Sequence, residues 1–399
     1  MTYLQHQQKP LLTSGLLLLL AIIAGISVAN LYYLQPLLAE ISTTFKVDPT
    51  TVGIGAMLTQ VGYALGMLFI LPLADIYNKK RLICIVAIGA GVIMFILGIT
   101  NNLWLFLAST LLLGIFSVTP QLIVPLGAEL ALPENRGAVI GQIMSGLFIG
   151  ILLSRTVSGF VGEYLGWYAI YLIAAGLMVL IVVLVILRLP NYHQPQSIGY
   201  RQLFKSIFVI ARQESVLRAA ALNGGLIFAV FSIFWTVLPF WLASDVYHLG
   251  PQVVGIFGLV GVIGVIAAPI AGKMADRRSP EVTISWAILI VILSYLCFLL
   301  AGNHLAGLVI GVILLDLGVQ SCQISNQARI FALSDSARNR INTFYMVSYF
   351  CGGAFGSWLG ALCYTHWGWN GASLAGLALL ILALGFNRKP RNMVIQRQS

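Results

Sequence analysis

The chain has 399 residues, of which 59% are hydrophobic and 9% charged, with a mean hydropathy of +0.94 and a formal net charge of +10. So much apolar surface exceeds what one soluble core can bury, which excludes an ordinary soluble protein. The cations are scattered over short segments and form no basic run interleaved with aromatic residues, so we expect no nucleic-acid binding.

Twelve apolar stretches are each long enough, at about 20 residues, to cross about 30 Å of hydrocarbon. In chain order the predicted spans are 13–38, 50–73, 82–99, 104–128, 138–161, 167–187, 218–243, 252–272, 282–301, 305–328, 341–364 and 368–386. The predicted fold class is therefore an all-α membrane protein with twelve transmembrane helices.

Lysine and arginine residues fall in alternate connections between these spans. Of the 22, only Lys46 and Arg155 lie elsewhere. The cationic connections are the N-terminus, 75–81, 129–137, 188–218, 273–281, 329–340 and the C-terminus. Because cationic loops stay in the cytoplasm during insertion, we expect a multi-pass protein in a lipid bilayer with both termini cytoplasmic.

The connection that follows the second span is repeated after the eighth. Each copy places an Ala-Asp pair, at Asp75 or Asp276, just before a cluster of cations. The first cluster is Lys79, Lys80 and Arg81, and the second copy reads Gly272, Ala275, Asp276 and Arg277. A second repeat, Asn135-Arg136 and Asn339-Arg340, precedes the fifth and eleventh spans. Repetition at half the chain length predicts two pseudo-symmetric bundles of six helices.

The predicted bundles are residues 1–188 and 217–399, joined by a cytoplasmic linker at 189–216. Within this linker Leu203, Phe204, Ile207 and Phe208 recur at helical spacing. The spacing predicts a short amphipathic helix lying on the inner face of the membrane.

Two charged residues lie deep in the spans, Arg155 in the fifth and Asp316 in the tenth. A charge at mid-bilayer costs at least a few kcal/mol, so it normally faces a bundle interior and has a partner. We expect Asp316 to be the protonatable group, with Arg155 as its partner or as a counter-charge that responds to substrate. The alternative is a static ion pair that joins the two bundles.

The sequence contains no motif typical of an enzyme. It shows no Cys/His cluster, nucleophile elbow, phosphate loop or nucleotide fingerprint. The prediction is no enzyme, no metal and no cofactor.

The repeated loops carry a family resemblance. The chain resembles the major facilitator superfamily over its whole length and, within it, bacterial twelve-span drug/proton antiporter-type exporters. The superfamily's loop motif, roughly Gly-x-Leu-Ala-Asp-Arg-x-Gly-Arg-Lys, is matched at Leu73, Ala74, Asp75, Lys79 and Lys80, with departures at Leu71, Ile76 and Asn78. The resemblance implies a bacterial inner-membrane location.

In the resembled fold, a carboxylate at Asp75 can cap the N-terminus of the eleventh span, and Asp276 can cap that of the fifth. The cations beyond can pair with Glu129 or Glu134. The gating set implied in this way is Asp75, Lys79, Lys80, Arg81, Arg136, Gly272, Asp276, Arg277 and Arg340. The same residues could instead only set topology and cap helices.

The fifth span resembles a glycine-rich motif of the antiporters. Its small residues are Gly141, Gly146, Gly150, Ser154, Ser158 and Gly159, with Arg155 in place of the motif's proline. Small residues at this spacing allow close helix approach, so we expect a tight seam between the bundles, although such residues also pack membrane helices generally. The arginine usual in the fourth span is replaced by Thr110.

Polar and aromatic residues around the two deep charges are expected to line a central cavity. They are Asn30, Tyr33, Gln35, Gln60, Tyr63, Gln121, Asn223, Trp235, Gln320, Asn326 and Tyr345. For each of them, interfacial anchoring or helix-to-helix hydrogen bonding is the alternative.

The expected function is proton-coupled export of small molecules by alternating access, with protons and a small-molecule substrate as partners and a monomer as the working unit. Two alternatives remain: a proton symporter that imports a sugar or other metabolite, and a membrane sensor that does not transport. One deep acid favours export over sugar import, and no segment is long enough for a sensor's output domain.

Overall fold

The computed structural model describes residues 12–191, 199–262, 280–334 and 337–388, and their regular secondary structure is helical. Within these residues, nine segments are long and apolar enough to cross a membrane. Two shorter apolar helices, Ser14–Ala29 and Pro251–Val262, coincide with the first and eighth predicted spans. Because the eighth predicted span runs beyond the described residues, the count of twelve stays a prediction.

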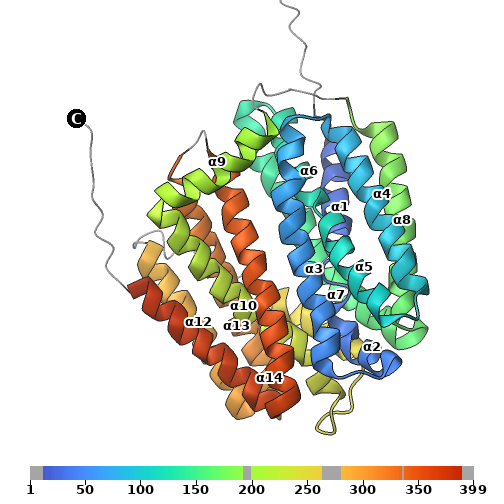
Figure 1. Ribbon diagram of the computed structural model, residues 1–399, viewed down its shortest axis with the longest axis vertical. Coiled ribbons are helices and arrows are strands. Elements are labelled where there is room, and N and C mark those ends of the chain that lie inside the picture. Colours follow the sequence, from blue (N-terminus) through green and yellow to red (C-terminus); the bar gives the residue numbers. More distant parts are fainter. Residues whose placement is uncertain (1–11, 192–198, 263–279, 335–336, 389–399) are drawn as a thin grey trace, which may run out of the picture.

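Two groups of helices stand side by side (Figure 1). The first, here the N-terminal half, comprises α1 (Ser14–Ala29), η1 (Gln35–Leu37), α2 (Leu38–Phe45), α3 (Pro49–Phe69), η2 (Leu71–Asp75), α4 (Lys79–Ile99), α5 (Leu103–Phe116), α6 (Thr119–Leu130), η3 (Pro133–Asn135), α7 (Arg136–Leu165) and α8 (Trp167–Arg188). The second, the C-terminal half, comprises α10 (Ser215–Ala243), the helix Pro251–Val262, α12 (Pro280–Ala301), α13 (Leu305–Phe331) and α14 (Arg338–Arg388).

Local chemistry sets where these helices start and break. Asp48 begins α3 by accepting a hydrogen bond from the Thr51 N–H (3.0 Å), and Asn78 begins α4 in the same way. The first predicted span is interrupted after Ala29, and the fourth is divided at Ser117 just before Pro120. The last two predicted spans form the single helix α14, whose direction changes at Gly368, with φ of 61°. Glycine adopts such an angle without the cost that a side chain would add.

The linker contains α9 (Tyr200–Gln213), which lies across one end of the molecule (Figure 1). Its Leu203 and Ile207 are buried, Phe204 stacks on Phe69 with centroids 5.6 Å apart, and Phe208 is exposed. The helix contacts both η2 and α14. It therefore links the two halves at that end.

The seam between the halves has two distinguishable ends. The basic end is where α3 runs into η2, α7 and α14 begin, and α9 lies; the opposite end holds α2 and residues 244–250. Helix α10 lies nearest the centre. In its most apolar stretch of 18 residues 83% are buried, whereas the corresponding share is at most 56% in the other candidate spans of the described residues. It packs along α14 and α13, so its side chains are well placed to meet those of the N-terminal half.

Candidate functional site

The centre of the seam holds the Arg155 side chain, which is 2% exposed. Its guanidinium carbon lies 4.0 Å from the ring centroid of Trp235, 4.9 Å from that of Tyr32 and 5.6 Å from that of Phe231. Its Nε donates a hydrogen bond to Oε1 of Gln35 (2.8 Å). Aromatic faces attract a cation, and the attraction is stronger where water is excluded. An aromatic cage built by both halves therefore holds this charge.

The helix Pro251–Val262 forms one wall of this centre through three glycines. The Gly255 carbonyl accepts a hydrogen bond from Thr156 Oγ1 (2.9 Å). A methyl group at Gly258 would lie 3.0 Å from Cβ of Arg155, and one at Gly261 would lie 2.7 Å from Oδ2 of Asp316. Both deep charges therefore rest against the same helix, where the lack of side chains makes room for them.

Asp316, on α13, is 4% exposed and is not ion-paired with Arg155, although both residues are described. Among the described residues, its Oδ2 has no hydrogen-bond partner, and neither does Nη2 of Arg155 or Nε1 of Trp235. The alternative of a static ion pair joining the halves is therefore wrong for this structure. Arg155 instead uses Gln35 and aromatic rings, because α7 presents it toward η1 and α10.

Several predicted cavity residues lie on the seam with these charges. Gln60 on α3 donates to Ser357 Oγ of α14 (2.8 Å) and accepts from Ser232 Oγ of α10 (3.4 Å). Tyr63 accepts a hydrogen bond from Gln121 (3.2 Å), and its ring packs on Phe350 of α14 at 4.5 Å. Together with Gln35 and Trp235, these residues make cross-half contacts or support them.

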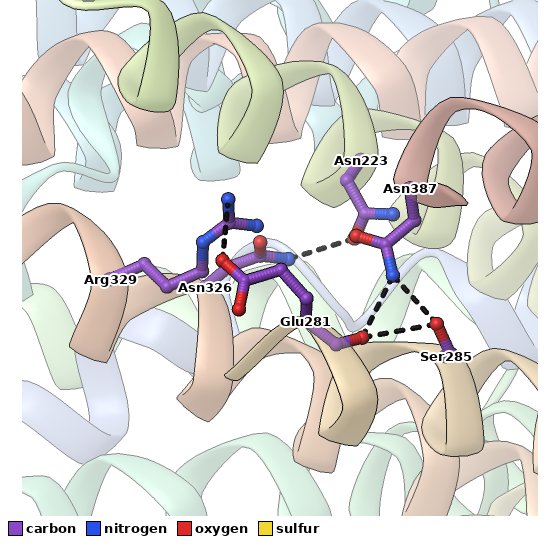
Figure 2. Close-up of polar contacts among 6 residues, drawn as sticks. All are labelled: Asn223, Glu281, Ser285, Asn326, Arg329 and Asn387. Carbon is purple, nitrogen blue, oxygen red and sulfur yellow. Dashed lines mark hydrogen bonds and ion pairs between the residues drawn. The ribbon is translucent and has the colours of Figure 1, made fainter. Parts of the chain in front are cut away.

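A second group of predicted residues forms a cluster inside the C-terminal half. Asn326 Nδ2 donates to Oδ1 of Asn223 (2.9 Å), which also accepts from the Cys322 thiol (3.1 Å), and Tyr345 packs on Gly224. Figure 2 shows the asparagine pair beside the Arg329–Glu281 ion pair (3.2 Å). Within the part of the chain that the structure describes, the amide nitrogen of Asn223 and the amide oxygen of Asn326 are buried without hydrogen-bond partners. This cluster bonds α10 to α13, separately from the Arg155 cage.

The remaining predicted cavity residues lie elsewhere. Asn30 contacts the Met178 sulfur of α8 at 3.7 Å, which places it inside the N-terminal half. Tyr33 is buried, and Gln320 is partly buried one turn after Asp316. Thr110 donates to the Leu107 carbonyl within its own helix (2.7 Å).

The loop motif places charges at the basic end, as the sequence predicts. Lys79 pairs with Glu129 at 2.5 Å, while Lys80 donates to the Ile186 and Leu189 carbonyls at the end of α8. Asp75, Lys79, Glu129 and Arg340 line a pocket between the halves, which Gln121 also borders. Of the other predicted gating residues, Arg81 and Arg136 are exposed. Gly272, Asp276 and Arg277 lie outside the described residues.

The small residues of α7 do not share one interface. A methyl group at Gly146 would lie 2.4 Å from the Ala21 carbonyl oxygen, and one at Gly150 would lie 2.1 Å from that of Gly25, so both face α1 inside the N-terminal half. A methyl group at Gly159 would lie 2.4 Å from the Pro251 carbonyl oxygen, across the seam. A methyl group added at Gly141 would meet nothing within 4 Å. The prediction of a seam lined by all of these residues is thus corrected for Gly141, Gly146 and Gly150. Ser154 and Ser158 are buried and donate to carbonyls of their own helix.

Sequence reasoning missed parts of the seam. Phe231 lies four residues before Trp235 on α10, and that helical spacing could have flagged it as a second cage wall. At the opposite end it missed Tyr164, whose hydroxyl donates to Gln252 (3.3 Å), and the Thr50–Thr365 hydrogen bond (2.8 Å). The described residues show no cluster of three or more His, Cys, Asp and Glu able to hold a metal ion.

The chain is similar to known transporters. It is 38% identical over 394 residues, 98% of this chain and 99% of the relative, to "Uncharacterized transporter YgaY" of Escherichia coli O157:H7. It is 23% identical over 226 residues, 55% of this chain and 54% of the relative, to "Multidrug resistance protein MdtG" of Serratia proteamaculans (strain 568). A solved bacterial homolog of the human lysosomal transporter Spinster shares the fold, with a TM-score of 0.76 at 13% identity over 94% of this chain and 96% of that one.

The sequence profile of the Major Facilitator Superfamily matches residues 17–328. That range covers α1 through most of α13, and therefore includes Arg155, Trp235 and Asp316. By sequence and by fold, the chain belongs to the Major Facilitator Superfamily and is a membrane-spanning transporter.

Proposed function

We propose that this transporter exports small molecules from the bacterial cytoplasm in exchange for protons. In this proposal, bundles 1–188 and 217–399 rock about the central seam as a monomer, and the linker 189–216 and both termini face the cytoplasm. One observation carries it: two opposite buried charges rest on the same helix of the seam without pairing with each other.

Asp316 is the proton site of the proposal. A buried carboxylate with an unpartnered oxygen is costly, and a bound proton removes its charge. When the halves move, the carboxylate gains water or a cation and the proton can leave. Its place against Gly261 makes it sensitive to such motion, because the helix Pro251–Val262 contacts the N-terminal half at Gly255 and Gly258.

Arg155 supplies the counter-charge and senses the same motion. It belongs to α7, but Trp235 and Phe231 of the C-terminal half form part of its cage. Separation of the halves would remove those rings from the guanidinium and expose it to water. The cage is therefore complete in one arrangement of the halves and incomplete in the other.

The test is proton movement in proteoliposomes under a pH gradient, with wild type compared with Asp316→Asn. We expect substrate-dependent proton flux in wild type and none in the variant. Glu281→Gln is the matched control, because it also neutralises one acid of the C-terminal half but lies in the Arg329 ion pair. Full coupling in Asp316→Asn would refute Asp316 as the proton site.

The sign of the flux separates export from import. Proton entry accompanied by substrate exit supports antiport, whereas movement of both in one direction indicates a symporter. The resemblance of α7 to antiporters and the likeness to "Multidrug resistance protein MdtG" support export.

A further inference from the structure

The two central charges each keep one atom free. Nη2 of Arg155 and Oδ2 of Asp316 are buried and have no hydrogen-bond partner. Leaving a buried charged group unsatisfied is expensive, and the cost disappears if a ligand supplies the missing partner. The two free atoms therefore define which hydrogen-bonding groups and charges a ligand at this place must carry.

On the Arg155 side, the ligand has to offer a hydrogen-bond acceptor. Gln35 occupies Nε and the rings of Trp235 and Tyr32 lie over the guanidinium, while Nη2 is buried with its hydrogens free to donate. Nε1 of Trp235 is a second buried donor without a partner. Guanidinium groups bind carboxylates strongly and with fixed geometry. The same positive charge repels a ligand that is only a cation.

On the Asp316 side, the ligand has to offer a donor or a positive charge, because an ionised carboxylate only accepts hydrogen bonds. Arg155 and Asp316 touch the helix Pro251–Val262 at Gly258 and Gly261. Three residues of helix correspond to about 4.5 Å along the axis. Both side chains therefore border one short stretch of this helix, where a small molecule that carries both charges can meet them.

We propose that the substrate is a small apolar zwitterion of the amino-acid type. Its carboxylate binds Nη2 of Arg155 and Nε1 of Trp235, its ammonium group binds Asp316, and its apolar body packs on Phe231 and Tyr32. This inference rests on the proposed function and deepens it, because ammonium and proton would compete for the same carboxylate.

The experiment measures binding to the purified protein in detergent, by thermal stability and tryptophan fluorescence, without any gradient. Three probes are used in matched form: L-leucine, L-methionine and L-phenylalanine, their N-acetyl derivatives, and the amines that lack the carboxylate. We expect the free amino acids to bind at least about tenfold more tightly than either derivative, since each derivative leaves one buried charge unpaired.

Variants assign each end of the ligand. Arg155→Lys keeps the charge and lacks the planar fork, and we expect it to lose the preference for amino acid over amine. Asp316→Asn is expected to lose the preference for amino acid over N-acetyl derivative. Glu281→Gln, away from the site, should keep both preferences.

Three outcomes would overturn the inference: equal binding of the acetylated series, equal binding of the amines, or no binding by any probe. Failure of the proposed function looks different. If the amino acids bind and no proton moves in proteoliposomes, the coupling proposal fails and the substrate inference stands. If protons move with other compounds while no amino acid binds, the reverse holds.

Discussion

The two ends of the seam are held by different chemistry. At the opposite end, neutral hydrogen bonds and close backbone contacts join the halves directly, at Thr50–Thr365 and where Gly159 meets Pro251. At the basic end, charged residues of both halves, Asp75 and Arg340 among them, surround a pocket. Neutral close contacts need near-complete approach of two helices, whereas charges act across a gap. The opposite end is thus the end that requires tight closure.

The largest expected effect comes from a bulky residue at Gly159. Gly159→Leu would push against the Pro251 carbonyl, because a single methyl group there already lies 2.4 Å from its oxygen. Overpacking costs about 1–3 kcal/mol, which corresponds to about a 5- to 150-fold shift of the equilibrium toward separation at the opposite end. The measurement is cross-linking of cysteines placed at Thr50 and Thr365, and we expect the yield to fall.

Two glycines of α7 serve as controls for this experiment. Gly141→Leu adds the same side chain where nothing lies within 4 Å, and we expect an unchanged yield. Gly150→Leu would disturb the α1 contact inside the N-terminal half, so it should lower thermal stability more than it changes cross-linking. Equal cross-linking in Gly159→Leu and Gly141→Leu would show that the seam does not close at Gly159.

A smaller effect is expected from the Lys79–Glu129 pair at the basic end. The side chains are 13% and 36% exposed, so water screens the pair and its contribution should be about 1 kcal/mol or less. Lys79→Glu and Glu129→Lys should each lower the melting temperature, since each places like charges together beside Asp75. The double variant Lys79→Glu, Glu129→Lys should recover most of the lost melting temperature. If its decrease instead equals the sum of the decreases in the two single variants, the result would argue against direct pairing.

The sequence predicts most of the fold, because its signals are local. Apolar length marks the helices, cation placement marks the basic end, and the spacing of Leu203 and Ile207 marks α9. Even the Lys79–Glu129 pair follows, since the motif loop and the end of α6 lie at the same end of the N-terminal half.

The site is less predictable, because it depends on how helices are rotated against one another. The sequence singles out Arg155 and Asp316 as opposite charges deep in the spans, which suggests an ion pair that the structure does not form. Whether Trp235, 80 residues further along the chain (235 minus 155), meets Arg155 depends on the rotation of α10 about its axis. Likewise, the small residues of α7 show regular spacing, but spacing does not say that Gly150 meets α1 whereas Gly159 meets the other half.

The smallest expected effect concerns pH at the opposite end, where Glu40 accepts a hydrogen bond from the Trp167 N–H (3.1 Å). Burial raises the pKa of Glu40; the Trp167 hydrogen bond works against this, and the nearby Glu163 carboxylate adds to it. A carboxyl whose pKa is raised by folding binds its proton more tightly in the folded state. Its contribution to stability is therefore present below the ordinary pKa and is lost as the pH rises through the raised value.

Asp48, in the same region, provides a comparison of opposite sign. Although burial works the other way, hydrogen bonds from Thr51 and neighbouring backbone groups lower the pKa of Asp48. It therefore stabilises above its ordinary pKa and loses that contribution as the pH falls. In melting temperatures measured across acidic pH, Glu40→Gln should make stability rise more steeply with pH, and Asp48→Asn should make it rise less steeply. Matching slopes in the two variants would mean that neither carboxyl has the environment described.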